Sequence, residues 1–254
     1  MKIALIQTEI KDYDIDLNFQ CIKFLLSRVE KDVDLVVLPE MFLTGFVTET
    51  SLAKESGEKG LVLMREFANT NNIAIEGSLL IEEDGKYYNR HYFVTKQEEV
   101  FYDKIHLFSL SKEATILTKG KEKDVIINYK GFRIKLLTCY DLRFVSCSNN
   151  AYKEGSFLYD MLVYVACWPE SRKEQWKTLL QARAIENQAY VIGVNRQGED
   201  SERKLYSGDS CIVNSKGEFL TQITNWENTI IYHNIDKEEL DGSRNKFPVY
   251  LDWE

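Results

Sequence analysis

The sequence contains few of the residues that mark linkers or membrane spans. It has only three prolines, and no apolar run approaches the roughly 20 residues that a membrane-spanning helix needs. With 28% charged residues, the scarcity of proline argues against long disordered linkers. The first five residues carry one positive charge and soon give way to polar residues, which is not typical of a signal peptide. We therefore expect a cytoplasmic protein without a membrane partner.

Cysteine and histidine are also scarce. An odd, scattered set of five cysteines without a Cys-x-x-Cys pair indicates reduced thiols. The three histidines, His91, His106 and His233, show no metal-ligand spacing with the cysteines or with one another. We expect no metal, although ligands far apart in the sequence stay open, and we expect His106 to be structural or to anchor a loop.

Acidic residues outnumber basic residues, 40 to 32. The net charge is −8 and the isoelectric point is about 5.2. Nucleic-acid binding depends mainly on neutralisation of phosphates by lysine and arginine, so this balance gives no sign of a nucleic-acid partner.

What the chain does contain is the material for a large core. Its 254 residues are 44% hydrophobic and 12% aromatic, which suits one α/β domain over 1–254. Helices are expected at about 16–29, with Asp16 as the cap, at 60–69 and at 170–188, the longest. The expected strands are 2–6, 34–38, 73–80, 87–95, 99–102, 125–129, 132–138, 161–166, 190–194, 211–214, 218–224 and 229–235.

This order predicts a mixed sheet with helices outside. The irregular stretch at 108–121 is long enough to suggest a functional loop.

Three polar residues follow predicted strands. Glu40 follows the apolar run at 34–38, Lys104 follows the strand at 99–102, and Cys139 follows the strand at 132–138. Ligands and catalytic groups gather at the carboxyl ends of strands in α/β sheets. Each residue alone has an ordinary interpretation: a solvated glutamate, a surface lysine and a small buried cysteine.

Together the three residues suit attack on a carbonyl carbon. A glutamate beside a cysteine can take the thiol proton during attack. A lysine can stabilise the oxyanion of the tetrahedral intermediate, helped by a backbone N–H such as that of Tyr140. No histidine holds a comparable position, which separates this arrangement from a cysteine–histidine protease, with His106 left open.

Around these residues the sequence resembles the nitrilase, or carbon–nitrogen hydrolase, superfamily. The similar segments are LPEMF at 38–42, YDKIHLF at 102–108 and LTCYDLRF at 137–144, in the family's order of Glu, Lys and Cys. The segments at 168–172, 182–190 and 206–210 resemble small bacterial omega-amidase-like members. Glu113 matches the family's second glutamate, or is a charge on a loop surface.

The resemblance implies a four-layer α-β-β-α sandwich with mixed sheets, often a homodimer or a higher homo-oligomer. It implies a thioester mechanism without metal or organic cofactor, in which Cys139 attacks, Glu40 is general base and acid, and Lys104 stabilises the intermediate. Val145, Cys147 and Cys167 depart from residues common in close members and put the shape of the pocket in question.

The first functional hypothesis is an amidase for a small carboxylate-bearing ω-amide such as 2-oxoglutaramate. Tyr140, Trp168 and Arg172 are the predicted substrate-binding residues, and Arg172 suits a bidentate pair with a carboxylate unless it is a surface arginine. The alternatives are hydrolysis of a nitrile, a carbamoyl group or a modified-peptide amide, or a non-catalytic interaction protein. A redox role is disfavoured because no resolving cysteine is evident.

Overall fold

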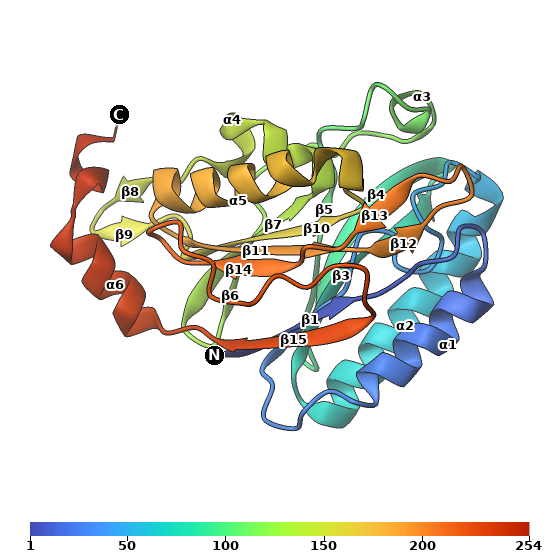
Figure 1. The fold of residues 1–254 in the computed structure, drawn as a ribbon, viewed down its shortest axis with the longest axis horizontal. Coiled ribbons are helices and arrows are strands. Elements are labelled where there is room, and N and C mark those ends of the chain that lie inside the picture. The colour runs from blue at the N-terminus through green and yellow to red at the C-terminus, as the bar shows by residue number, and fades with distance from the viewer. Residues whose placement is uncertain (254) are drawn as a thin grey trace.

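Two mixed β-sheets pack face to face between helices in the computed structural model, which describes residues 1–253 (Figure 1). Helices α1 and α2 cover the outer face of one sheet, and α5 covers the outer face of the other. This is the predicted α-β-β-α sandwich. No helix in the described part of the chain is long and apolar enough to cross a membrane.

The first sheet has the order β15-β1-β2-β3-β4-β5. Strands β1, β2 and β3 run parallel, while β15 and the β3-β4-β5 hairpins pair antiparallel. Its strands are β1 (Lys2–Gln7), β2 (Leu35–Val37), β3 (Ala74–Glu83), β4 (Lys86–Val94), β5 (Glu99–Asp103) and β15 (Thr229–Asn234).

The second sheet has the order β14-β11-β10-β7-β6, with β7, β10 and β11 parallel. Its strands are β6 (Ile126–Tyr129), β7 (Phe132–Thr138), β10 (Met161–Ala166), β11 (Tyr190–Asn195) and β14 (Cys211–Val213). Two small hairpins lie outside the main sheets: β8 (Tyr152–Lys153) with β9 (Ser156–Phe157), and β12 (Gln197–Glu199) with β13 (Leu205–Ser207).

The helices are α1 (Ile15–Leu26), α2 (Ala53–Asn71), α3 (Glu113–Ile116), α4 (Val145–Ser148), α5 (Lys173–Asn187) and α6 (Lys237–Lys246). Alternation along β1 divides the core: Leu5 faces the second sheet, whereas Ile6 packs towards α1 and α2. Burial on both faces explains why β2 and β10 are continuous apolar runs.

Two helix predictions were wrong in their bounds. Asp14, not Asp16, caps α1, because its side chain accepts a hydrogen bond of 3.0 Å from the backbone N–H of Leu17. Helix α2 begins at Ala53 rather than at residue 60, and its 19 residues exceed the 15 of α5. Glycine lowers helix preference, yet both Gly57 and Gly60 lie within α2, where a Cβ at Gly60 would lie 2.5 Å from Leu79. These glycines therefore let the helix approach β3.

The predicted strand at 218–224 does not form. The turn before it is present, with Gly217 at φ +82°, but only the bridge from Val213 to Phe219 follows. The side chain of Thr221 accepts the hydrogen bond of the Ile212 N–H at 3.1 Å, so a side chain replaces the backbone partner that a strand would supply.

Candidate active site

Glu40 follows β2 and is fully buried. Pro39 ends the strand, and Met41 has a left-handed backbone at φ +45°, so the chain turns sharply around Glu40. One carboxylate oxygen accepts hydrogen bonds from Lys104 Nζ at 2.9 Å and Asn89 Nδ2 at 2.7 Å. The other accepts from the backbone N–H of Cys167 at 2.7 Å. Three donors therefore fix a carboxylate that would be costly to bury alone.

Lys104 follows β5 and joins two carboxylates. Its Nζ lies 2.9 Å from Glu40 and 2.9 Å from Glu113, with both side chains of each pair fully buried. Burial lowers the pKa of Lys104, but Glu113 and Glu40 outweigh that effect and hold the pKa well above the ordinary lysine value. The ammonium is therefore charged at neutral pH.

Glu113 lies at the start of α3, inside the long loop that the sequence marked as irregular. Its carboxylate also accepts from the backbone N–H of Phe108 at 2.6 Å, so the loop folds back onto Lys104. Burial raises the pKa of Glu113 above the usual range, against the lowering effect of Lys104. The surface-charge interpretation of Glu113 was wrong, since the residue is fully buried.

Cys139 follows β7 and starts a 3₁₀ turn, Cys139–Arg143, with a left-handed φ of +45°. Its exposure is 9%, and it lines a cavity together with Lys104. Burial raises the pKa of the Cys139 thiol well above its ordinary value, and nearby Glu40 raises it further while Lys104 lowers it. In the resting protein Cys139 is therefore a neutral thiol, and the nearby Glu40 carboxylate can accept its proton.

The three predicted substrate-binding residues, Tyr140, Trp168 and Arg172, all line this cavity. The indole N–H of Trp168 donates to the backbone oxygen of Arg172 at 2.7 Å, and the Arg143 guanidinium lies 4.8 Å from the centre of the Trp168 ring. Within residues 1–253, neither Arg143 nor Arg172 has a carboxylate within 4 Å. The remaining lining residues are Phe46, Phe108, Cys167, Pro169, Lys204 and Tyr206. The cavity thus offers cations and no acidic side chain.

Sequence reasoning missed Asn89, whereas it singled out Cys167 as a residue that affects the shape of the pocket. The Asn89 amide on β4 donates to both Glu40 and Glu113, at 2.7 and 3.3 Å, and a lone asparagine in a strand gives no sequence signal. Cys167 lines the same cavity as Cys139, and its thiol donates to the backbone oxygen of Glu40 at 3.3 Å.

His106 anchors the loop after Lys104, as predicted. Its backbone N–H and its ring Nδ1 each lie 3.0 Å from Asp141 Oδ1. The other oxygen of Asp141 accepts from the Tyr102 hydroxyl at 2.8 Å and from the backbone N–H of Thr138 at 3.0 Å. Asp141 therefore ties the Lys104 loop to the turn that carries Cys139.

Comparison with known proteins agrees with this fold and identifies the family. A family model described as carbon-nitrogen hydrolase matches residues 2–245, and the chain belongs to the carbon–nitrogen hydrolase family. It is accordingly a hydrolase of carbon–nitrogen bonds in non-peptide amides.

Full-length relatives are found in several bacteria. The omega-amidase YafV of Escherichia coli (strain K12) is 36% identical over 253 residues, which cover 99% of this chain and 96% of the relative. The 2-oxoglutaramate amidase of Bacillus subtilis is 30% identical, with 98% and 96% covered. Among solved structures, XC1258 of Xanthomonas campestris, a CN-hydrolase superfamily protein with an arsenic adduct in its active site, has a TM-score of 0.96 at 32% identity, with 100% and 97% covered.

Proposed function

We propose that this protein is an omega-amidase, which hydrolyses a small carboxylate-bearing ω-amide such as 2-oxoglutaramate to the acid and ammonia. The observation that carries the proposal is the cavity, where the buried Cys139 thiol faces space lined by Arg143 and Arg172. Neither guanidinium has a carboxylate partner among residues 1–253, so a substrate carboxylate can pair with one of them. The names of the YafV and B. subtilis relatives support the same substrate class.

In the proposed mechanism, Cys139 Sγ attacks the amide carbon while its proton passes to Glu40. The raised pKa of Cys139 makes this transfer necessary during attack, because little thiolate exists beforehand. Lys104 stabilises the oxyanion, with Glu113 and Asn89 holding Lys104 and Glu40 in place.

Collapse of the tetrahedral intermediate breaks the carbon–nitrogen bond, and Glu40 returns the proton to the leaving ammonia. A thioester remains on Cys139. Water then attacks it while Glu40 accepts a proton, and the second collapse releases the acid and restores the thiol. No redox partner or metal enters these steps.

The test is ammonia release from 2-oxoglutaramate by wild type and by Cys139→Ala. We expect release by wild type and none above background from the variant. No release by folded wild-type protein would contradict the omega-amidase and direct the search to nitriles, carbamoyl compounds and modified-peptide amides, the other substrates of the class. Release that survives in Cys139→Ala would contradict the nucleophile instead.

Carboxylate recognition gives a second prediction. Arg172→Lys keeps the charge but loses the planar pair of donors, so kcat/KM for 2-oxoglutaramate should fall about tenfold or more. The rate with a neutral amide such as propionamide is the matched control and should change less than twofold. Equal losses on both substrates would contradict a role of Arg172 in carboxylate binding.

We also propose that residues 1–254 act as one catalytic domain, in the cytoplasm, as a homodimer or higher homo-oligomer. All five cysteines are free, which suits a reducing compartment. Light scattering of the purified protein tests the assembly, and a purely monomeric mass would contradict it. Cell fractionation tests the compartment.

A further inference from the structure

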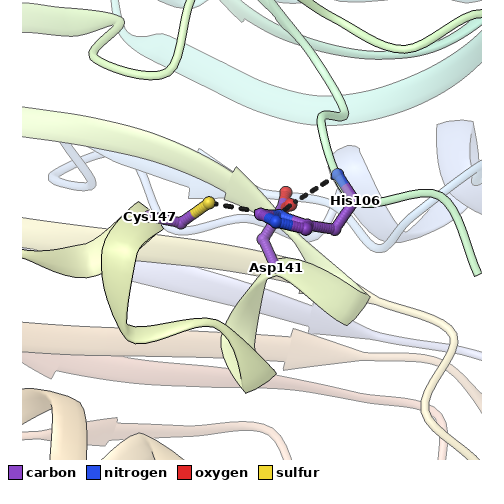
Figure 2. Close-up of side chains that lie close together, drawn as sticks. All are labelled: His106, Asp141 and Cys147. Carbon is purple, nitrogen blue, oxygen red and sulfur yellow. Dashed lines mark hydrogen bonds and ion pairs between the residues drawn. The ribbon is translucent and has the colours of Figure 1, made fainter.

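A second cluster of chemically active side chains lies beside the active site. His106 from the loop after β5, Asp141 from the 3₁₀ turn and Cys147 from α4 point towards one another (Figure 2). Their ligand atoms all lie within 4.8 Å of one another, and this is the one such group in residues 1–253. The three positions are 35 and six residues apart in the sequence, which is why ligand spacing did not reveal them.

We propose that His106, Asp141 and Cys147 form a binding site for a divalent metal ion of the zinc type. Imidazole, carboxylate and thiolate are the ligands that Zn²⁺ takes in proteins.

The distances fit such an ion. His106 Nδ1 lies 3.0 Å from Asp141 Oδ1 and 3.2 Å from Cys147 Sγ. Around a tetrahedral zinc with ordinary bond lengths, a nitrogen and an oxygen ligand are about 3.3 Å apart, and a nitrogen and a sulfur ligand about 3.5 Å. For these two pairs, movement of a few tenths of an ångström makes room for the ion. The third pair, the Asp141 carboxylate and Cys147 Sγ, lies within 4.8 Å, and the fourth position is left for water.

The surroundings hold two of the ligands in orientation. The His106 ring is stacked on Phe144 with centroids 3.8 Å apart. Asp141 Oδ2 is held by Tyr102 and by the backbone of Thr138, which leaves Oδ1 to face the cluster. In known metal sites, hydrogen bonds of this kind orient the side chains that coordinate the metal. The His106 side chain is 26% exposed and gives an ion access to a cluster whose other members are buried.

A catalytic cysteine–histidine–aspartate triad does not explain this arrangement. Such a triad places the thiol and the carboxylate on opposite ring nitrogens, whereas both lie on Nδ1 here. Without an ion, a single proton on Nδ1 can be donated to Asp141 Oδ1, and no second proton is left on Nδ1 for the Cys147 sulfur at 3.2 Å. A metal ion satisfies all three groups: Cys147 loses its thiol proton to solvent, and His106 binds as the neutral tautomer protonated on Nε2.

The test is titration of the full chain with Co²⁺, which replaces Zn²⁺ and gives a visible spectrum with a thiolate charge-transfer band. The protein carries Cys139→Ala, so the cavity nucleophile is not a ligand and the outcome is independent of the proposed amidase activity. We expect saturation at one Co²⁺ per chain with the thiolate band, and displacement by Zn²⁺.

Adding Cys147→Ser should remove the thiolate band and weaken Co²⁺ binding at least about a hundredfold, more than the loss of an outer-shell partner. Cys21→Ser changes an exposed cysteine and is the matched control, which should bind as the parent does. Circular dichroism checks the fold, and Cys147→Ala replaces the serine variant if that variant unfolds. Absence of a thiolate band in the parent, or its persistence in the folded Cys147 variant, would overturn the metal site.

Discussion

Two buried glutamates, one just after β2 and one on the neighbouring strand β3, differ in how the fold accommodates a buried acid. Glu40 after β2 has three hydrogen-bond donors, including the Lys104 ammonium. Glu76 on β3 is equally buried, but neither of its carboxyl oxygens has a partner within residues 1–253. His91 Nε2 lies 3.7 Å from Glu76 Oε2, which is too far for a hydrogen bond.

The surroundings of Glu40 and Glu76 also differ in whether they stabilise charged or neutral side chains. Burial raises the pKa of Glu76 well above its usual range and lowers the pKa of His91 to about 3. Burial therefore favours the neutral form of both groups, whereas Lys104 is charged between its carboxylates. His91 Nδ1 lies 3.2 Å from the Leu137 carbonyl, which can only accept, so His91 carries its proton on Nδ1. The acid that we propose for proton transfer is thus the one to which the fold supplies donors and a cation.

The same substitution at the two glutamates gives the largest contrast. Glu40→Gln removes the proposed proton acceptor and should lower kcat/KM by about 10³ or more. Glu76→Gln keeps the shape of a side chain whose neutral form burial favours, and its activity should stay within about twofold of wild type. Steady-state ammonia release measures both, with thermal melts as the check on folding. Similar activity losses in the two variants would contradict the distinction.

Removing a buried lysine should destabilise the protein most where its carboxylate partners are buried as well. Lys104→Met leaves Glu40 and Glu113 buried without their ion pair, and the free energy of unfolding should fall by about 3–5 kcal/mol. Lys135→Met is the matched control, because Lys135 is equally buried but its partner Asp124 is 40% exposed and can be hydrated. That variant should lose less than about 1 kcal/mol. Urea denaturation measures both variants. Equal losses in the free energy of unfolding would show that the loss does not depend on buried carboxylate partners.

The smallest expected effect is a pH dependence of stability from the uncharged pair. The folded protein keeps a proton on Glu76 that the unfolded chain releases above about pH 4.5, so this group makes stability fall as pH rises. His91 acts in the opposite direction between its folded pKa of about 3 and its unfolded value of 6.5. The two effects oppose each other between pH 4.5 and 6.5.

Above pH 6.5 only Glu76 contributes, with a slope of up to about 1.4 kcal/mol per pH unit. Glu76→Gln should remove that slope, so the stability difference between variant and wild type should widen from pH 6.5 to 8.5 in urea denaturation. Parallel curves over this range would mean that Glu76 is already ionised in the folded protein.

The sequence revealed the parts of the site that lie in characteristic order along the chain. Glu40, Lys104, Cys139 and Glu113 lie in recognisable segments, and the strands before the first three are continuous or alternating apolar runs. Asn89 had no signal because its importance comes from two carboxylates that reach it from other segments. The cluster of His106, Asp141 and Cys147 was missed for the same reason.

The errors in the fold also have local causes. The expected helix started at Gly60 and left out the first turns of α2, which begins at Ala53. Glycine disfavours helices by its backbone freedom, yet the close approach of α2 to β3 requires Gly57 and Gly60 there. The stretch at 218–224 has the composition of a strand, but Thr221 takes a hydrogen bond that a ladder would need. Such tertiary contacts override local preference and are not visible in a single sequence.

The left-handed backbone at Cys139, the proposed nucleophile, limits which side chains this position can hold. Serine has an unbranched Cβ and can occupy φ +45° as cysteine does, whereas threonine is β-branched and strongly disfavoured there. A single nucleotide change converts a cysteine codon into a serine codon, so serine can replace Cys139 without a change in the backbone turn. Threonine would require a different turn.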